Sequence, residues 1–154
     1  MSKTVMVGCD LHDRTMLLRY AVDAGVPQEI CFPNDARGRR RLLRYFRELA
    51  KETGAQSIIM VYEASGQGFG LADLLHQNGM ECFVLSPTHL PKTPKAAKLK
   101  TDSRDAQMLL EQLRGHMLAG NALPVVWTVV RGFRAYHFRG RASHENAESV
   151  AGVA

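Results

Sequence analysis

The feature that most constrains the fold of this 154-residue chain is a pair of strand-length apolar segments separated by a short helical segment. Residues 57–62 (SIIMVY) are continuously apolar, and residues 81–86 (ECFVLS) are nearly so. A continuously apolar strand is typical of a central strand that is covered on both faces. The alternation of strand, helix and strand predicts a βαβ unit with two parallel strands.

Three more strands are predicted before this unit, the first from its β-branched residues. They are expected at residues 4–10, 15–22 and 28–33, and the first two form a hairpin. A helix follows, with Asn34 or Asp35 as its N-cap, and Gly54 ends it. With a last helix at about 101–118, the pattern predicts an α/β fold with a mixed five-stranded sheet and flanking helices.

The length allows one domain with one main core. We expect this domain to span residues 1–127, because the segment after Trp127 has no sustained apolar period. Residues 128–154 are therefore predicted to be a divergent, poorly structured tail.

Composition excludes several classes of protein. The three cysteines, Cys9, Cys31 and Cys82, lie in apolar segments without C-x-x-C spacing, which favours buried thiols over disulfides or a zinc site. No apolar segment approaches the ~18 residues that span a bilayer, and the N-terminus does not resemble a signal peptide. We therefore expect a cytoplasmic protein that does not enter membranes.

The positive charge lies in two blocks. Residues 36–54 hold seven Arg and Lys residues against two Glu, whereas residues 55–90 hold no Arg or Lys. The first block is either a solvated helix face or a nucleic-acid contact. The second block directly precedes the last helix and is the stronger candidate for nucleic-acid binding; it consists of Lys92, Lys95, Lys98, Lys100 and Arg104.

Four carboxylates occupy unusual positions. Asp10 and Glu63 end predicted strands, where side chains commonly line a ligand crevice in α/β folds. Asp102 and Asp105 open the last helix, on the same stripe as its apolar residues. Each has a simpler explanation: Asp102 and Asp105 would serve as N-terminal caps, and the strand-end acids as turn or solvated residues. Taken together, the four acids could converge at one edge of the sheet.

Converging carboxylates repel one another unless a cation neutralises them. Oxygen ligands suit Mg²⁺ or Mn²⁺, and a pair of such ions supports in-line phosphoryl displacement. The neighbouring lysines would hold an anionic backbone. The residues therefore point to nucleic acid as the substrate class.

Three segments resemble the N-terminal domain of the DEDD-type transposases of insertion sequences, a family also described as bridge-RNA-guided recombinases. They are VGCDLH (7–12), VYEASGQGFGLADLL (61–75) and VLSPTHLPKTPKAAKLKTDSRDAQMLLEQL (84–113). The most specific parts are YEASG (62–66) and KTDSRDAQMLL (100–110).

This resemblance implies a RuvC-like ribonuclease H fold and places the family's acidic tetrad on Asp10, Glu63, Asp102 and Asp105. It also implies divalent metal binding, action on DNA during transposition and recombination, and a part in holding a guide RNA. The same four residues are therefore expected to be both catalytic and metal-binding.

The family continues into a second domain that supplies a catalytic serine, and residues 128–154 do not resemble that continuation. We therefore expect a truncated copy that is incomplete as an enzyme on its own. It would act with full-length transposase or as a homo-oligomer. The alternatives are a nucleic-acid-binding remnant without turnover and an inactive gene product.

Overall fold

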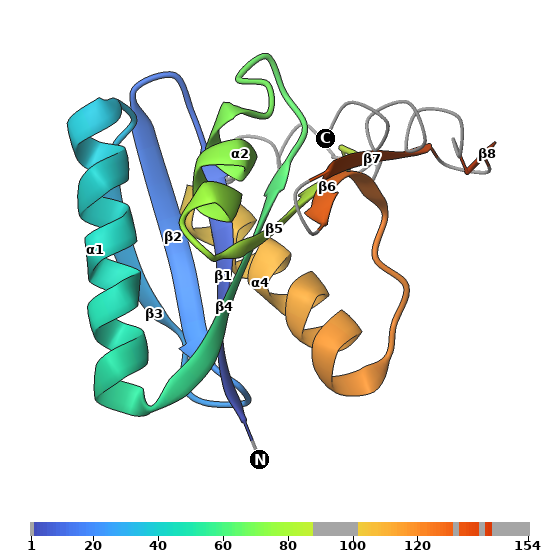
Figure 1. Ribbon diagram of the computed structural model, residues 1–154. Helices are drawn as coiled ribbons and strands as arrows, with labels where there is room; N and C mark the ends of the chain where they lie inside the picture. Colours follow the sequence, from blue (N-terminus) through green and yellow to red (C-terminus); the bar gives the residue numbers. More distant parts are fainter. Residues whose placement is uncertain (1, 88–101, 131–132, 139–140, 143–154) are drawn as a thin grey trace.

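A computed structural model describes residues 2–87, 102–130, 133–138 and 141–142 (Figure 1). Four of the five predicted DNA-binding cations, Lys92, Lys95, Lys98 and Lys100, lie outside the described residues. The side chain of Asp102 also lies outside the description, although its backbone begins a helix.

The sheet is mixed, as predicted. β1 (Lys3–Leu11) pairs antiparallel with β2 (Thr15–Val22), which pairs antiparallel with β3 (Gln28–Pro33). On the other side of β1 lie β4 (Ala55–Glu63) and then β5 (Glu81–Leu85), both parallel to β1. The resulting order β3-β2-β1-β4-β5, with helices on the sheet, is the α/β, RuvC-like ribonuclease H arrangement that the resemblance implied.

The prediction of only five strands is wrong. β6 (Val125–Val130) adds to the free edge of β5 in antiparallel orientation, and β7 (Phe133–Phe138) and β8 (Arg141–Ala142) continue the order. Part of the predicted tail therefore has strand structure. The remainder of the tail, residues 131–132, 139–140 and 143–154, lies outside the described residues.

Helices cover both faces of the sheet (Figure 1). On one face lie α1 (Ala36–Thr53) and α2 (Gly70–Gln77), and on the other lies α4 (Asp102–Ala119). Alternate residues of β1 serve the two cores: Val5, Val7 and Cys9 pack with α1 and α2, whereas Met6 packs with α4. The predicted two-sided burial of residues 57–62 is confirmed for Ile58 to Tyr62.

Gly8 sets how closely α4 approaches the sheet. A Cβ atom at Gly8 would lie 2.3 Å from the backbone oxygen of Ala106 and 2.5 Å from the backbone nitrogen of Leu110. Only a residue without a side chain allows this contact, so α4 rests directly on the backbone of β1. This contact lies two residues before Asp10.

The cap prediction for α1 is confirmed for Asp35, whose Oδ1 accepts a hydrogen bond from the Gly38 amide at 2.7 Å. Gly54 ends the helix in the left-handed region, with φ of 76°. Of the three cysteines, Cys9 and Cys82 are buried as expected, but Cys31 is exposed. Among the described residues, no helix is long and apolar enough to cross a membrane.

Candidate active site

Asp10 and Glu63 lie at matching positions on neighbouring parallel strands. Gly8 of β1 pairs with Val61 of β4, and the two acids each lie two residues further along. Since side chains alternate along a strand, Asp10 shares the face of Gly8, and Glu63 shares the face of Val61. Both faces pack against α4. The two acids are thus brought to one edge of the sheet, on the α4 side.

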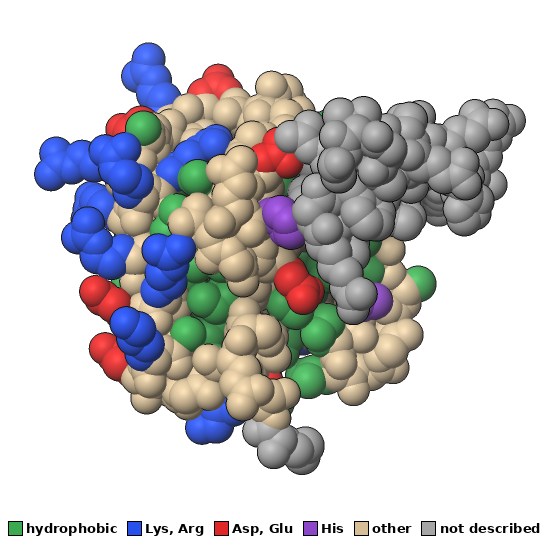
Figure 2. All heavy atoms as spheres, viewed as in Figure 1, with side chains coloured by type: hydrophobic (Ala, Val, Ile, Leu, Met, Phe, Trp, Pro, Cys, Tyr) green, Lys and Arg blue, Asp and Glu red, His purple; other side chains and the backbone are tan. Residues whose placement is uncertain are grey.

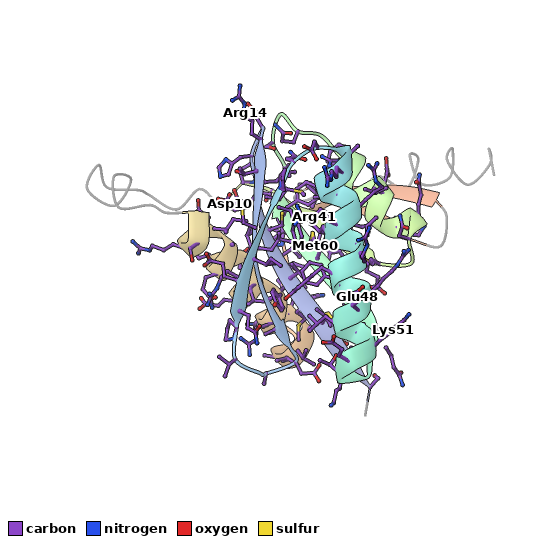
Figure 3. All side chains as sticks on the ribbon, turned by 90° about the vertical axis from the view of Figure 1, so that its left-hand side faces the viewer. Asp10, Arg14, Arg41, Glu48, Lys51 and Met60 are labelled. Carbon is purple, nitrogen blue, oxygen red and sulfur yellow. The ribbon has the colours of Figure 1, made fainter. Side chains whose placement is uncertain are left out.

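The direction of α4 brings its first turn to the same edge. Ala106, near its start, touches Gly8, whereas Arg114 donates to the carbonyl oxygen of Gly25 at 2.9 Å, at the opposite end of the sheet. Asp105 directly precedes Ala106 and is half-buried. Figure 3 shows the labelled Asp10 beside the first turn of this helix. The first strand, the middle strand and the last helix therefore meet here.

Within the described side chains, no three His, Cys, Asp or Glu residues gather closely enough to hold a metal ion. The fourth acid, Asp102, has no described side chain. The donor chemistry nonetheless fits Mg²⁺ or Mn²⁺, because the acids that reach this edge offer carboxylate oxygens. The structure brings together the elements that carry the four acids. Coordination of a metal ion by the four side chains stays a prediction.

His12 is a neighbour that the predicted residue set leaves out. Its Nε2 lies 2.8 Å from Oδ2 of Asp10, whose side chain is only 14% exposed. Residues two apart on an extended segment share a face, so the D-x-H spacing at positions 10 and 12 was the available signal. Such a hydrogen bond fixes the orientation of a carboxylate.

The residues next to the acids in sequence face the other core. Burial, followed by the nearby charge of Asp10, raises the pKa of the Cys9 thiol well above its ordinary range. Cys9 therefore stays a neutral thiol beside the candidate site. Burial likewise raises the pKa of Tyr62, and its hydroxyl donates to the carbonyl oxygen of Gly68 at 3.1 Å. That bond fixes the loop that leaves β4 directly after Glu63.

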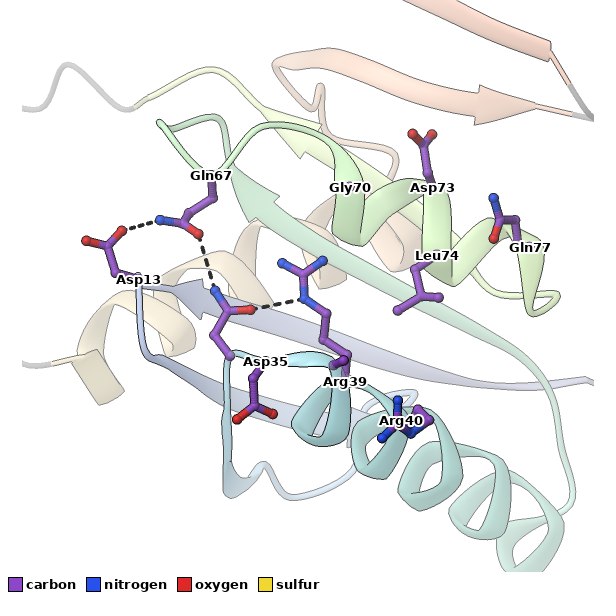
Figure 4. Close-up of a pocket in the computed structure, with 11 residues that line it drawn as sticks. Asp13, Asp35, Arg39, Arg40, Gln67, Gly70, Asp73, Leu74 and Gln77 are labelled. Carbon is purple, nitrogen blue, oxygen red and sulfur yellow. Dashed lines mark hydrogen bonds between the residues drawn. The ribbon is translucent and has the colours of Figure 1, made fainter.

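A second polar cluster lies between α1 and α2, where a pocket of about 690 Å³ opens (Figure 4). Nδ2 of Asn34 donates to the Gln67 side chain at 3.3 Å, and Gln67 in turn donates to Asp13. Nε of Arg39 donates to Asn34 at 3.0 Å. Sequence reasoning missed this cluster, because its members come from three separate loops and from the first turn of α1, and share no periodicity.

Arg104 is exposed on the first turn of α4. It borders a shallow pocket of about 370 Å³ together with Arg19, Gln107 and Glu111. Of the predicted DNA-binding cations, it is the one within the described residues.

Comparison with known proteins decides the family. The sequence model of a transposase family, the DEDD transposases of IS110 type, matches residues 7–134. This chain belongs to that family. The match to the DEDD transposases includes all four predicted acids and continues through β6 into β7.

Individual relatives agree with this assignment. The transposase of insertion sequence element IS1533 from Leptospira borgpetersenii is 29% identical over 115 residues, and the candidate transposase y4qE of Sinorhizobium fredii is 35% identical over 69 residues. These alignments cover 74% and 45% of this DEDD transposase chain, but only 32% and 17% of the relatives. The chain thus spans at most about a third of their length. Among solved structures, T. thermophilus RuvC in complex with a Holliday junction substrate gives a TM-score of 0.48 at 13% identity, covering 79% of this chain and 99% of that one.

Proposed function

We propose that residues 1–127 form a DNA-processing domain of a transposase, in which Asp10, Glu63, Asp102 and Asp105 bind Mg²⁺ or Mn²⁺. The observation that carries this proposal is the contact between Gly8 and Ala106, because it docks the acidic start of α4 beside the strand that bears Asp10. The matched register of Asp10 and Glu63 supports it.

The roles of the residues follow from their chemistry. Mg²⁺ or Mn²⁺ held by these residues would stabilise the attacking and leaving oxygens of an in-line phosphoryl displacement. The four carboxylates would hold the cations and neutralise their charge. This is the catalytic role that we assign to the carboxylates. His12 is a positioning residue, because its hydrogen bond orients the Asp10 carboxylate.

The proposed substrate is DNA, processed during transposition and recombination of an insertion sequence in the cytoplasm. Five cations would hold its backbone beside the acids: Lys92, Lys95, Lys98, Lys100 and Arg104. Four of them precede the acidic helix in sequence, and Arg104 lies on its first turn. A guide RNA, a second copy of the chain and full-length transposase are the further partners that we propose from family membership.

A binding module without turnover is the second candidate. It is favoured by the formal net charge of +5, because an excess of cations supports binding to an anionic backbone with or without strand cleavage. Such a module would still grip nucleic acid through its cations, and its binding would weaken with salt.

Thermal melting with and without Mn²⁺ tests the proposed metal site. A ligand that binds only the folded state at 100 times its Kd stabilises it by about 2.7 kcal/mol. For a chain of this length, that corresponds to a rise in Tm of about 5–10 °C. We expect this rise for the natural sequence and expect its loss in Asp10→Asn/Asp105→Asn.

The matched control is Glu48→Gln/Glu52→Gln, which removes two exposed acids from α1 on the other face of the sheet. This variant should keep the full Mn²⁺ response. An equal response in all three proteins would contradict the assignment. Incubation of labelled duplex and single-stranded DNA with Mn²⁺ then separates the two candidates, because only the enzyme cuts the strand.

A further inference from the structure

The exposed side of α1 carries a continuous basic stripe. Its members follow i, i+3 and i+4 spacing, so they lie on one narrow face of the helix: Arg37, Arg40, Arg44, Arg47 and Lys51. All five are exposed, and Arg41 is exposed beside them. The stripe covers 14 residue steps, or about 21 Å at 1.5 Å per residue. Figure 2 shows blue side chains gathered along this side of the molecule.

This charge is not neutralised within the described part of the chain. No ion pair between the six cations and a carboxylate is present there. Arg47 instead donates to Oδ1 of Asn78 at 2.7 Å, and the Arg41 guanidinium lies 5.9 Å from the centre of the Phe32 ring. Four of the arginines alone line a groove of about 320 Å³: Arg37, Arg40, Arg41 and Arg44. Like charges this close on a helix are destabilising, so the groove favours an anionic partner.

We propose that this stripe binds the phosphate backbone of double-stranded DNA. Guanidinium groups match phosphate oxygens in shape and charge, and a straight row of them suits a regular array of phosphates. The duplex carries one negative charge per about 1.7 Å of its axis, so a 21 Å row of cations meets several phosphates.

The aromatic residues of α1 favour a duplex over a single strand. Proteins that bind single strands stack bases on accessible aromatic rings. Phe46 is fully buried, and the Tyr45 ring packs edge-on against Tyr20, Phe32 and Phe46. No exposed aromatic side chain lies along the stripe among the described residues. The surface is therefore suited to contact with a backbone and not with bases.

The stripe lies across the sheet from the proposed metal site. α1 packs on the face served by Val5 and Val7, whereas the acids lie on the face that α4 covers. DNA held on α1 is therefore a different segment from DNA at the acids, such as flanking sequence or a second duplex. The inference does not rest on metal binding or cleavage.

Fluorescence anisotropy of a labelled 20-base-pair duplex tests whether the stripe binds DNA. The affinity of the full chain for the duplex is measured in EDTA at a series of KCl concentrations. In Arg40→Gln/Arg44→Gln, two phosphate contacts are lost, so the slope of log K against log[salt] should fall in magnitude by about 1.8. At 0.1 M salt this is about 60-fold weaker binding. Glutamine is a good helix former, and both positions are exposed, so the variant should stay folded. Arg37→Gln/Arg44→Gln provides a second version of the same test.

Two controls make the result specific. Arg14→Gln/Arg114→Gln removes the same charge from other elements and should retain most of the affinity, and Arg40→Lys/Arg44→Lys should retain most of the salt slope. Equal weakening in the Arg14/Arg114 variant, or an unchanged slope in both stripe variants, would overturn the proposal. Tighter, stripe-dependent binding of a single strand of equal length would overturn the choice of duplex. All binding is measured in EDTA, so absence of the Mn²⁺ response in the melting experiment leaves this inference standing.

Discussion

At the residue scale, Gly8 controls the candidate site although it carries no functional group. Alanine there would force its Cβ to within 2.3 Å of the Ala106 oxygen, so α4 would have to move away from β1. Overpacking of this kind costs typically about 1–3 kcal/mol. We therefore expect Gly8→Ala to lower the urea midpoint of unfolding and to weaken the Mn²⁺ response, because the start of α4 shifts relative to Asp10.

The matched control for this substitution is Gly66→Ala. A Cβ atom at Gly66 meets no other atom within 4 Å, and its φ is not positive. The alanine should therefore be neutral or slightly stabilising, through the lower entropy of the unfolded chain. If the two variants have the same urea midpoint, the close approach of α4 is not what holds the site together.

The sequence was sufficient to predict Asp10 and Glu63 as candidate site residues, but not the role of Gly8 in positioning α4 beside them. Asp10 and Glu63 stood out because polar residues end apolar strands, a signal local to each segment. The role of Gly8 depends on Ala106, almost a hundred residues later, so no local pattern reveals it. The exposure of Cys31 was mispredicted for a related reason, because burial within β3 depends on which face the neighbouring helices cover.

At the element scale, the strands and helices before residue 119 were predictable because their signals are local. The β-branched residues of β1, the continuous apolar segment of β4 and the caps of α1 each lie within or next to the element concerned. β6 was missed for the opposite reason. It pairs Trp127 with Val84 and Thr128 with Phe83, so its strand structure depends on a partner about forty residues earlier.

The N-cap of α1 gives a prediction at this scale. Asp35 satisfies the Gly38 amide, which would otherwise lose its partner at the start of the helix that carries the basic stripe. Asp35→Ala should lower the unfolding free energy by about 1 kcal/mol, whereas Asp35→Ser should keep most of it because serine also caps. Urea unfolding followed by circular dichroism measures both. An equal loss in both variants would mean that the cap bond contributes little.

At the scale of the whole molecule, the sheet separates two kinds of surface. The elements that carry the four acids meet on the α4 side, and the basic stripe of α1 lies on the other side. Because β1 and β4 supply buried residues to both cores, the two surfaces share one folding unit. Loss of either core should therefore abolish both metal binding and DNA binding, whereas exposed substitutions should separate them.

We expect this folding unit to extend beyond residue 127 and to include β6 and β7. All four acids precede residue 127, the predicted domain boundary, but the β5–β6 ladder continues to Thr128, and β7 pairs with β6 beyond it. A chain ending at Trp127 should keep the Mn²⁺ response. It should also have a lower urea midpoint than a chain ending at Phe138, and self-associate more, because shortening β6 and removing β7 exposes unpaired strand edges. Urea unfolding and sedimentation of the two chains provide the comparison. Equal stability would place the boundary at residue 127, and loss of the Mn²⁺ response in the shorter chain alone would make β6 and β7 part of the support for the metal site.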